Sequence, residues 1–395
     1  MTHKSISIFA QIIKSIFSRN DFQRVVNNHH GDKHAKGFSC WDQWIAMTFL
    51  HLSQLTSLRE IIGGLRCTMG KLTHLGMMSV PCRSTLSYAN AHRPWTLYRD
   101  TFFAVLSRCQ TTLQIGKAFR FKNKLLSMDS TFIQLCLELF PWASFRQKKG
   151  AVKVHMLLDH EGYFPVFAHV TTGKTADTKV AHTALLNAHV VPEGSIVVFD
   201  RGYVDFHLFS TLGERGVYFV TRLKEGMQWI VTLHGLVPKN SHILRNDEIQ
   251  FCSNTAKKIL GQQTFRLVES VDPKTGESIV LLTNHRTFGA TTIARIYKDR
   301  WQIEIFFKTI KQHLKIKTFV GTSENAVLIQ IWTALIAIMV LKYLKALSTA
   351  GFSLSNLITL LRLNLFSHRE LLEWLKNPYL IPLREPSAQV EINYG

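Results

Sequence analysis

The feature that most constrains this chain is one predicted helix, residues 293–317, with two kinds of face. Four polar side chains recur along it at offsets of zero, three, seven and fourteen residues: Tyr297, Arg300, Glu304 and Lys311. At about 100° per residue, these four fall within about 60° of the helix circumference, and Lys308 falls beside them. The adjoining apolar stripe predicts a helix docked on a core. It consists of Ile296, Ile303, Phe306, Phe307, Ile310 and Leu314.

A single carboxylate among cations on a docked helix needs a chemical reason, because a lone glutamate there is usually just solvated. We expect Glu304 to bind a divalent metal ion. We expect the other polar side chains of this face to contact nucleic-acid phosphate: Tyr297, Arg300, Lys308 and Lys311. Between positions 295 and 317 the helix carries seven Lys or Arg residues and two acidic residues. That surplus favours a phosphate-binding surface over a solvated face.

The charge of the whole chain agrees with this interpretation. Lys and Arg number 47 against 27 Asp and Glu, a net charge of +20. Such an excess indicates a polyanionic partner, either nucleic acid or an anionic membrane surface. A basic enzyme that is indifferent to nucleic acid is the alternative. The 395 residues, of which 46% are hydrophobic and 19% charged, predict a globular chain with room for two or three domains.

Neither the cysteines nor the apolar runs indicate secretion or a membrane. The six cysteines are scattered without C-x-x-C pairs, which predicts buried thiols in a reducing compartment rather than disulfides or a zinc site. The longest uncharged run, residues 325–341, is shorter than a membrane span and contains Gln330 and Thr333. We therefore expect a buried core helix there and no membrane partner.

Residues 120–222 alternate between strand and helix patterns. KLLSMDSTFIQL places Asp129 in a strand, residues 153–173 read as a hairpin around the turn DHEG, and SIVVFD places Asp200 at the end of an apolar strand after an intervening helix. This order predicts an α/β fold with an RNase H-like core, a mixed sheet with flanking helices. The strands of Asp129 and Asp200 are neighbours in that fold, so the two carboxylates should converge, with Glu304 completing the cluster. A simple turn or cap role is the commoner one for an aspartate at a strand end.

The chain after residue 222 divides into three parts. Residues 223–278 predict a β-rich insertion, because β-like runs alternate there with polar turns, and residues 279–345 return to the core with the helix of Glu304. Residues 346–395 predict a helical C-terminal extension followed by a proline-rich tail. These last helices either pack on the core or mediate dimerisation.

Residues 1–115 predict an all-helical N-terminal domain that binds DNA. A short helix is expected to end at the glycine pair 63–64, and a later one to begin at Arg83 or Ser84. The later helix should expose side chains suited to DNA: Arg83, Tyr88, Asn90, His92 and Arg93. The succession of short helices is similar to a helix-turn-helix arrangement, and a plain helical bundle is equally compatible with it.

Two weaker candidates lie around the predicted hairpin. Lys149 belongs to a basic stretch that either contacts DNA phosphate or forms a solvated loop. His155 and Asp159 share one strand face, where a structural role is favoured over contact with a metal.

The spacing Tyr-x2-Arg-x3-Glu-x6-Lys, within YKDRWQIEIFFKTIKQHLKI and after DST and DRGY, resembles the insertion-sequence DDE transposases of family four. The resemblance implies cut-and-paste movement of a bacterial insertion sequence. The steps would be metal-dependent cleavage of double-stranded DNA at terminal inverted repeats and strand transfer into target DNA. It also implies that Asp129, Asp200 and Glu304 are the catalytic and metal-binding residues. Mg²⁺ would be the cofactor and Mn²⁺ a substitute, since both prefer carboxylate oxygens.

The same resemblance implies further properties. The helical N-terminal domain would recognise the element ends, the protein would act as a homodimer on DNA, and it would reside in the bacterial cytoplasm at the nucleoid. In relatives that cut through a hairpin intermediate, an aromatic residue of the insertion stacks on a flipped base. Trp229 is the only tryptophan of this insertion, and ordinary packing is its alternative role.

Two other functions share part of this pattern. An RNase H-type nuclease would share the carboxylates without needing the Tyr-Arg-Glu-Lys spacing or the insertion. A catalytically silent, transposase-derived DNA-binding regulator would share the charge but would be expected to have lost one of the three acids. None of the three is lost.

Overall fold

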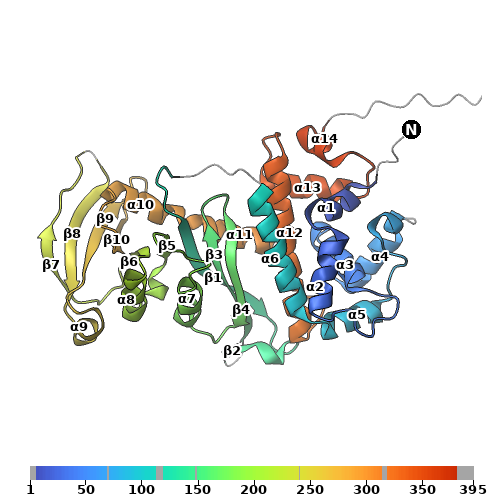
Figure 1. Ribbon diagram of the computed structural model, residues 1–395, viewed down its shortest axis with the longest axis horizontal. Coiled ribbons are helices and arrows are strands. Elements are labelled where there is room, and N and C mark those ends of the chain that lie inside the picture. The colour runs from blue at the N-terminus through green and yellow to red at the C-terminus, as the bar shows by residue number, and fades with distance from the viewer. Residues whose placement is uncertain are drawn as a thin grey trace, which may run out of the picture.

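A ten-stranded sheet forms one end of the molecule, and a bundle of helices forms the other (Figure 1). The computed structural model describes residues 6–68, 71–112, 119–146, 149–239, 241–313 and 318–379. The strands are β1 (Leu125–Leu135), β2 (Ser144–Arg146), β3 (Lys149–Asp159), β4 (Phe164–Thr172), β5 (Ile196–Phe199), β6 (Tyr218–Arg222), β7 (Trp229–His234), β8 (Ile243–Phe251), β9 (Thr264–Val271) and β10 (Ser278–Thr283).

Five strands have the neighbour order of an RNase H-like core, which confirms the predicted fold. In β4-β3-β1-β5-β6, β3 runs antiparallel to both β1 and β4, while β5 runs parallel to both β1 and β6. The short β2 pairs with the beginning of β3. The predicted neighbours, the strand of Asp129 and the strand before Asp200, are β1 and β5.

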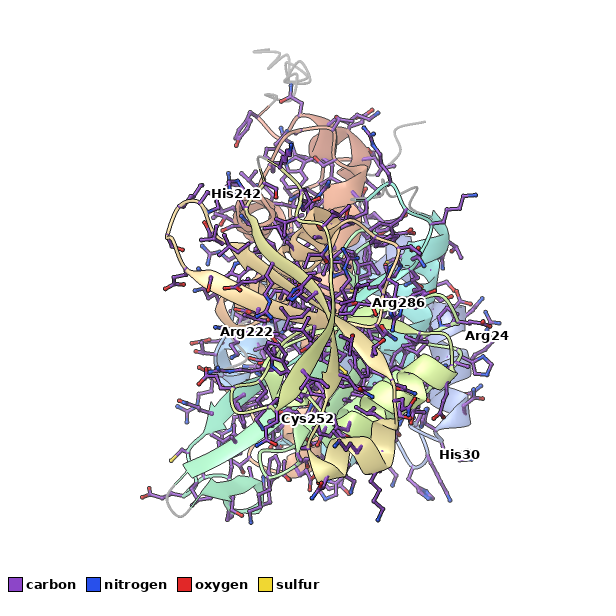
Figure 2. The ribbon with its side chains drawn as sticks, turned by 90° about the vertical axis from the view of Figure 1, so that its left-hand side faces the viewer. Arg24, His30, Arg222, His242, Cys252 and Arg286 are labelled. Atoms are coloured by element: carbon purple, nitrogen blue, oxygen red, sulfur yellow. The ribbon has the colours of Figure 1, made fainter. Side chains whose placement is uncertain are left out.

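The predicted insertion continues this sheet instead of forming a separate one. Beyond β6 the order is β10-β9-β8-β7, all antiparallel. Figure 2 views this end of the molecule, where His242 and Cys252 mark the two ends of β8. The insertion is rich in strands as predicted, and it also contains a helix that the sequence pattern did not predict, α9 (Asn254–Leu260).

Helices cover both faces of the sheet. One face packs against α7 (Asp177–Leu185), α8 (Phe206–Glu214) and α9, around buried residues such as Val197, Phe209 and Phe219. The other face packs against α10 (Ala290–Asp299) and α11 (Trp301–His313). Three-residue 3₁₀ turns, η2 (Pro141–Ala143) and η3 (Arg201–Tyr203), follow β1 and β5.

The single helix predicted over residues 293–317 is two helices that break at Arg300. The Arg300 amide donates to the Tyr297 carbonyl, and the Ile303 amide donates to the Arg300 carbonyl, so both bonds span three residues instead of four. Two cores cause the break. α10 buries Ile293 and Ile296 against the β5-β6 region, whereas α11 buries a different set against β1 and the helical bundle. Residues 314–317 lie outside the described residues.

The helical bundle is built around one long helix, α12 (Glu324–Leu347), which packs against helices from both ends of the chain (Figure 1). The others are α1 (Ile8–Ile16), α2 (Arg19–Asn28), α3 (Cys40–Leu52), α4 (Leu58–Arg66), η1 (Lys71–Leu75), α5 (Arg83–His92), α6 (Trp95–Thr112), α13 (Leu354–Asn364) and α14 (Leu371–Lys376). α12 is apolar and long enough to cross a membrane, but its most apolar stretch is 89% buried inside the protein. The prediction of a core helix is therefore confirmed.

Several local predictions in this bundle are wrong, including the predicted burial of Cys67 and Cys82, which are exposed. α4 continues through Gly63 and Gly64 to Arg66, because Ile61, Ile62 and Leu65 anchor it on the core on both sides of the glycines. Asn90, expected to be exposed, is 1% exposed and accepts a hydrogen bond from Gln43 at 2.7 Å. The proline-rich tail from residue 380 lies outside the described residues.

Candidate active site

Two parallel strands bring the first two predicted carboxylates to one edge of the sheet. The parallel register of β1 and β5 pairs Ser127 with Val198. Two residues further along both chains, Asp129 therefore lies level with Asp200, which directly follows β5. Charge interaction between the two raises the pKa of Asp129, as expected of neighbours. The convergence predicted from strand order is therefore present.

Arg300 joins the third carboxylate to this pair. Its Nη2 donates to Oε1 of Glu304 at 2.6 Å, and its Nη1 lies 3.4 Å from Oδ2 of Asp129. The Arg300 guanidinium lies 5.6 Å from the ring centre of Tyr297, and the Arg300 side chain is only 13% exposed. The helix break lets Arg300 point toward β1 while Glu304 follows one turn later on α11. Tyr297 and Glu304 thus both contact Arg300, which in turn reaches Asp129.

The environment of Asp129 disfavours its negative charge. The pKa of Asp129 is raised to about 7, chiefly by burial and also by the charges of the neighbouring Asp200 and Glu304, while the Ser130 amide and Arg300 oppose the increase. Burial also raises the pKa of Tyr297, which Arg300 lowers in part. A bound cation stabilises the ionised form of such a carboxylate, and the effect is largest where burial and neighbouring carboxylates make ionisation costly.

Asp200 is fixed by the tight turn that follows it. Its Oδ1 accepts the Gly202 amide at 2.8 Å, and its carbonyl accepts the Thr221 hydroxyl at 3.2 Å. A Cβ at Gly202 would lie 3.0 Å from the same Oδ1. A side chain at Gly202 would therefore crowd the carboxylate, and Tyr203, which is 2% exposed, anchors the turn in the core.

The donor set fits a hard divalent cation. Three carboxylates supply oxygen ligands of the type that Mg²⁺ and Mn²⁺ prefer. Within the described ranges, however, no group of three or more His, Cys, Asp or Glu side chains lies close enough together to hold a metal ion. Arg300 occupies the space between Asp129 and Glu304 and supplies the positive charge there.

A partly buried polar network lies beside Asp129, and sequence reasoning missed its centre, Asp177. Ser130 donates to Asp177 at 2.6 Å, Lys153 forms an ion pair with it at 2.9 Å, and His155 lies 3.4 Å away. Burial lowers the pKa of His155 to about 4. His155 is thus a structural residue, and it contacts Asp177 and Thr171 rather than Asp159. The one signal for Asp177 was its place in the first turn of a helix, where acids are common.

The remaining predicted DNA contacts lie outside this cluster. Lys308 is exposed and Lys311 half-buried, one and two turns after Glu304, so both follow the same face of α11. Trp229 begins β7, packs partly against the core and has the Arg245 guanidinium 5.0 Å from its ring centre. Lys149 begins β3, but its side chain lies outside the described part of the chain.

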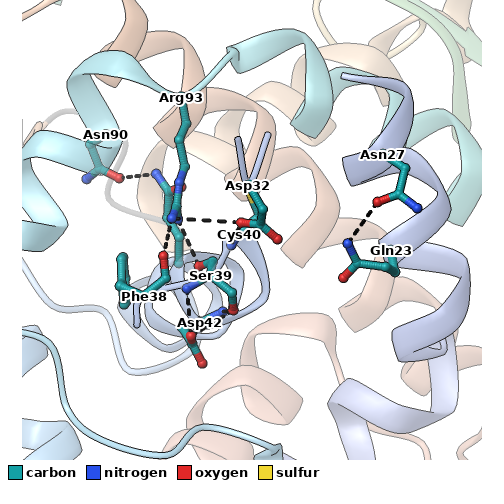
Figure 3. A network of polar contacts seen from close by, with 10 residues as sticks. Gln23, Asn27, Asp32, Phe38, Ser39, Cys40, Asp42, Asn90 and Arg93 are labelled. Atoms are coloured by element: carbon teal, nitrogen blue, oxygen red, sulfur yellow. Dashed lines mark hydrogen bonds and ion pairs between the residues drawn. The ribbon is translucent and has the colours of Figure 1, made fainter. Parts of the chain in front are cut away.

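The prediction that Arg93 contacts DNA is contradicted by its hydrogen bonds. Its guanidinium donates to the carbonyls of Phe38 and Ser39 and to Oε1 of Gln43, and it stacks on the Phe38 ring (Figure 3). The side chain is 11% exposed. Arg93 therefore ties α5 to the beginning of α3, and a phosphate would have to displace these partners.

Arg83 has a different environment. It lines an open groove of about 590 Å³ between the first turns of α4 and α5, together with Arg59 and the hydroxyls of Thr56, Ser84 and Ser87. Both arginines are exposed, and neither guanidinium has a hydrogen bond or ion pair within the described ranges.

Comparisons with known proteins identify the family of this chain. The family model described as "Transposase DDE domain" matches residues 120–340, more than half of the chain. A model described as "Domain of unknown function (DUF4372)" matches residues 4–78. A cryo-EM structure of the piggyBac transposase synaptic complex with hairpin DNA aligns at 13% identity and a TM-score of 0.48, covering 97% of this chain and 87% of that one.

Curated relatives match over most of their length. The "Putative transposase y4zB" of Sinorhizobium fredii is 29% identical over 305 residues, 74% of this chain and 79% of the relative. The "Probable transposase for insertion sequence element IS5377" of Geobacillus stearothermophilus is 29% identical over 264 residues, 66% of this chain and 67% of the relative. With Asp129 and Asp200 at one edge of an RNase H-like sheet and Glu304 reaching Asp129 through Arg300, the chain belongs to the transposase DDE domain family.

Proposed function

We propose that this protein is the transposase of a bacterial insertion sequence. It cleaves double-stranded DNA at the terminal inverted repeats of its element and transfers the freed ends into target DNA. The observation that carries this proposal is the meeting of Asp129, Arg300 and Glu304 beside Asp200. Relatives named as insertion-sequence transposases support the biological setting.

Each polar residue of the site has a role in phosphoryl transfer. Asp129, Asp200 and Glu304 would hold Mg²⁺, or Mn²⁺ in its place. When bound, such ions orient the attacking and leaving oxygens and offset the charge that develops in the transition state. Arg300 would bind a nonbridging phosphate oxygen through its planar fork, with Tyr297 beside it.

The DNA path extends from this site in two directions. Lys308 and Lys311 would contact backbone phosphates along α11, and Arg83 would contact phosphates at the groove in the helical bundle. Trp229 would stack on a flipped base near the cut, if a hairpin intermediate is formed. The DNA complex would be a homodimer that acts at the nucleoid.

Cleavage of DNA carrying the element's own terminal repeats tests the proposal. Wild type should cut at the repeat boundary with Mg²⁺, and Glu304→Gln should bind the same DNA but lose at least about a hundredfold in rate. Binding without cleavage by wild type, under any divalent metal, would favour the silent regulator. Cutting without regard to the repeats would favour an RNase H-type nuclease.

A further inference from the structure

A second polar cluster lies on the same side of β1 as Asp129. Ser127 precedes Asp129 by two residues, so both side chains leave the strand on one face. The Oγ of Ser127 lies 2.6 Å from Nε2 of His160, and Nδ1 of His160 lies 2.5 Å from Oδ2 of Asp299. Asp299 is the last residue of α10, directly before Arg300. The cluster therefore connects β1 to the point where the signature helix breaks.

His160 is held on every side. Its side chain and that of Ser127 are both enclosed, with the two residues 3% and 0% exposed. Its backbone amide donates to the Leu125 carbonyl at 3.0 Å, at the beginning of β1. The Tyr163 hydroxyl, from the same hairpin turn, donates to the Asp299 carboxylate at 3.3 Å. Asp299 is thus bound by two side chains of one rigid turn.

The order of these contacts is that of a Ser-His-Asp hydrolase triad, but the burial excludes that chemistry. A nucleophilic hydroxyl must reach a substrate carbonyl beside an oxyanion site. Ser127 is completely buried in the middle of the sheet, where no substrate can approach it. The cluster must therefore act indirectly, by holding Asp299 in place.

We propose that His160 is a positioning residue for DNA cleavage. By holding Asp299, it fixes the helix break at Arg300 over β1, so that Arg300 and Glu304 face Asp129. This inference rests on the proposed transposase function. A displacement of about 1 Å at a reacting group can cost about a hundredfold in rate, and loss of a partner that orients a metal ligand typically costs about 10–100-fold.

Two isosteric substitutions separate the two hydrogen bonds of the imidazole. In His160→Asn the amide nitrogen takes the place of Nδ1 and keeps the bond to Asp299. In His160→Gln the amide takes the place of Nε2 and keeps only the bond to Ser127. Each variant loses one buried hydrogen bond, so both should unfold at similar temperatures. Only the Gln variant should release Asp299.

The readout is the single-turnover rate of cleavage at saturating repeat DNA, measured with the full chain. His160→Asn should cleave within about threefold of wild type and His160→Gln about 10–100-fold more slowly, with unchanged DNA affinity in both. Equal rates in folded Asn and Gln variants would overturn the inference. An inactive wild type would instead refute the proposed function.

A milder variant keeps the test decisive if the buried substitutions prevent folding. Tyr163→Phe removes one hydrogen bond to Asp299 and keeps the ring. It should slow cleavage several-fold without weakening DNA binding. Tyr343→Phe removes a half-buried tyrosine hydroxyl on α12 and is the matched control, expected to cleave at the wild-type rate. A wild-type rate in Tyr163→Phe, with neither His160 variant folded, would also overturn the inference.

Discussion

Replacing Asp129 by asparagine should make the metal-free protein more stable at pH 8. Burial raises the pKa of Asp129 to about 7, against an ordinary value of 3.8. The folded state therefore holds this proton more tightly than the unfolded state does. The contribution of this proton to the free energy of unfolding is fully present below about pH 4 and is lost as the pH rises to about 7. At about 1.4 kcal/mol per pKa unit, the loss amounts to about 4 kcal/mol.

Asparagine has nearly the same shape and does not titrate, so Asp129→Asn escapes this loss. With about 2.1 cal/mol/K of unfolding entropy per residue over the whole chain, about 4 kcal/mol corresponds to about 5 °C in Tm. Thermal unfolding followed by circular dichroism in EDTA, from pH 4 to pH 8, measures the difference. Wild type and variant should coincide near pH 4 and separate toward pH 8.

The control is an aspartate whose pKa is shifted in the opposite direction. The Lys274 amide holds the pKa of Asp272 below its ordinary value, so Asp272→Asn should be destabilising above pH 4. Addition of Mg²⁺ at pH 8 should stabilise wild type and not Asp129→Asn. A difference between wild type and Asp129→Asn that does not depend on pH, or a less stable Asn variant at pH 8, would refute the reasoning.

Four further substitutions test the phosphate groove, the turn at Asp200 and the role of Arg93. The pair Arg59→Ala and Arg83→Ala should weaken binding of repeat DNA and reduce the slope of log Kd against log salt by about 2, as measured by fluorescence anisotropy; an unchanged slope would exclude the groove as a phosphate site. Gly202→Ala should displace the Asp200 carboxylate and slow cleavage about 10–100-fold while DNA affinity stays constant, which a gel-based cleavage assay would show. Arg93→Ala should cost roughly 2–4 kcal/mol in urea unfolding, because buried acceptors lose their donor, and should leave the salt slope unchanged.

The core of the fold and the convergence of the carboxylates could be predicted because they follow from local patterns. Alternating strands, a DHEG turn and an apolar run ending in Asp200 indicate an RNase H-like fold, and the strand order of that fold brings Asp129 and Asp200 together. That Tyr297, Arg300 and Glu304 lie on one helix face could be predicted from the helical period alone. These signals are carried by neighbouring residues and do not depend on distant contacts.

The features that were missed depend on distant contacts. The apolar spacing continues unbroken across Arg300, and the break arises because α10 and α11 dock on different cores. Asp177 becomes important only through Lys153 and Ser130, on two strands distant in sequence. Arg93 looks like any arginine of an exposed short helix until α3 is placed against it.

Metal-specific rescue of a thiolate ligand shows whether the carboxylates bind the metal that cleaves DNA. Cysteine binds Mn²⁺ better than Mg²⁺, because Mg²⁺ strongly prefers oxygen. Cleavage of repeat DNA by wild type and Asp200→Cys should therefore be compared in the two metals. We expect wild type to cut in both metals and Asp200→Cys to cut measurably only in Mn²⁺. Cleavage by Asp200→Cys in Mg²⁺ at the wild-type rate, or by wild type in EDTA, would contradict this expectation.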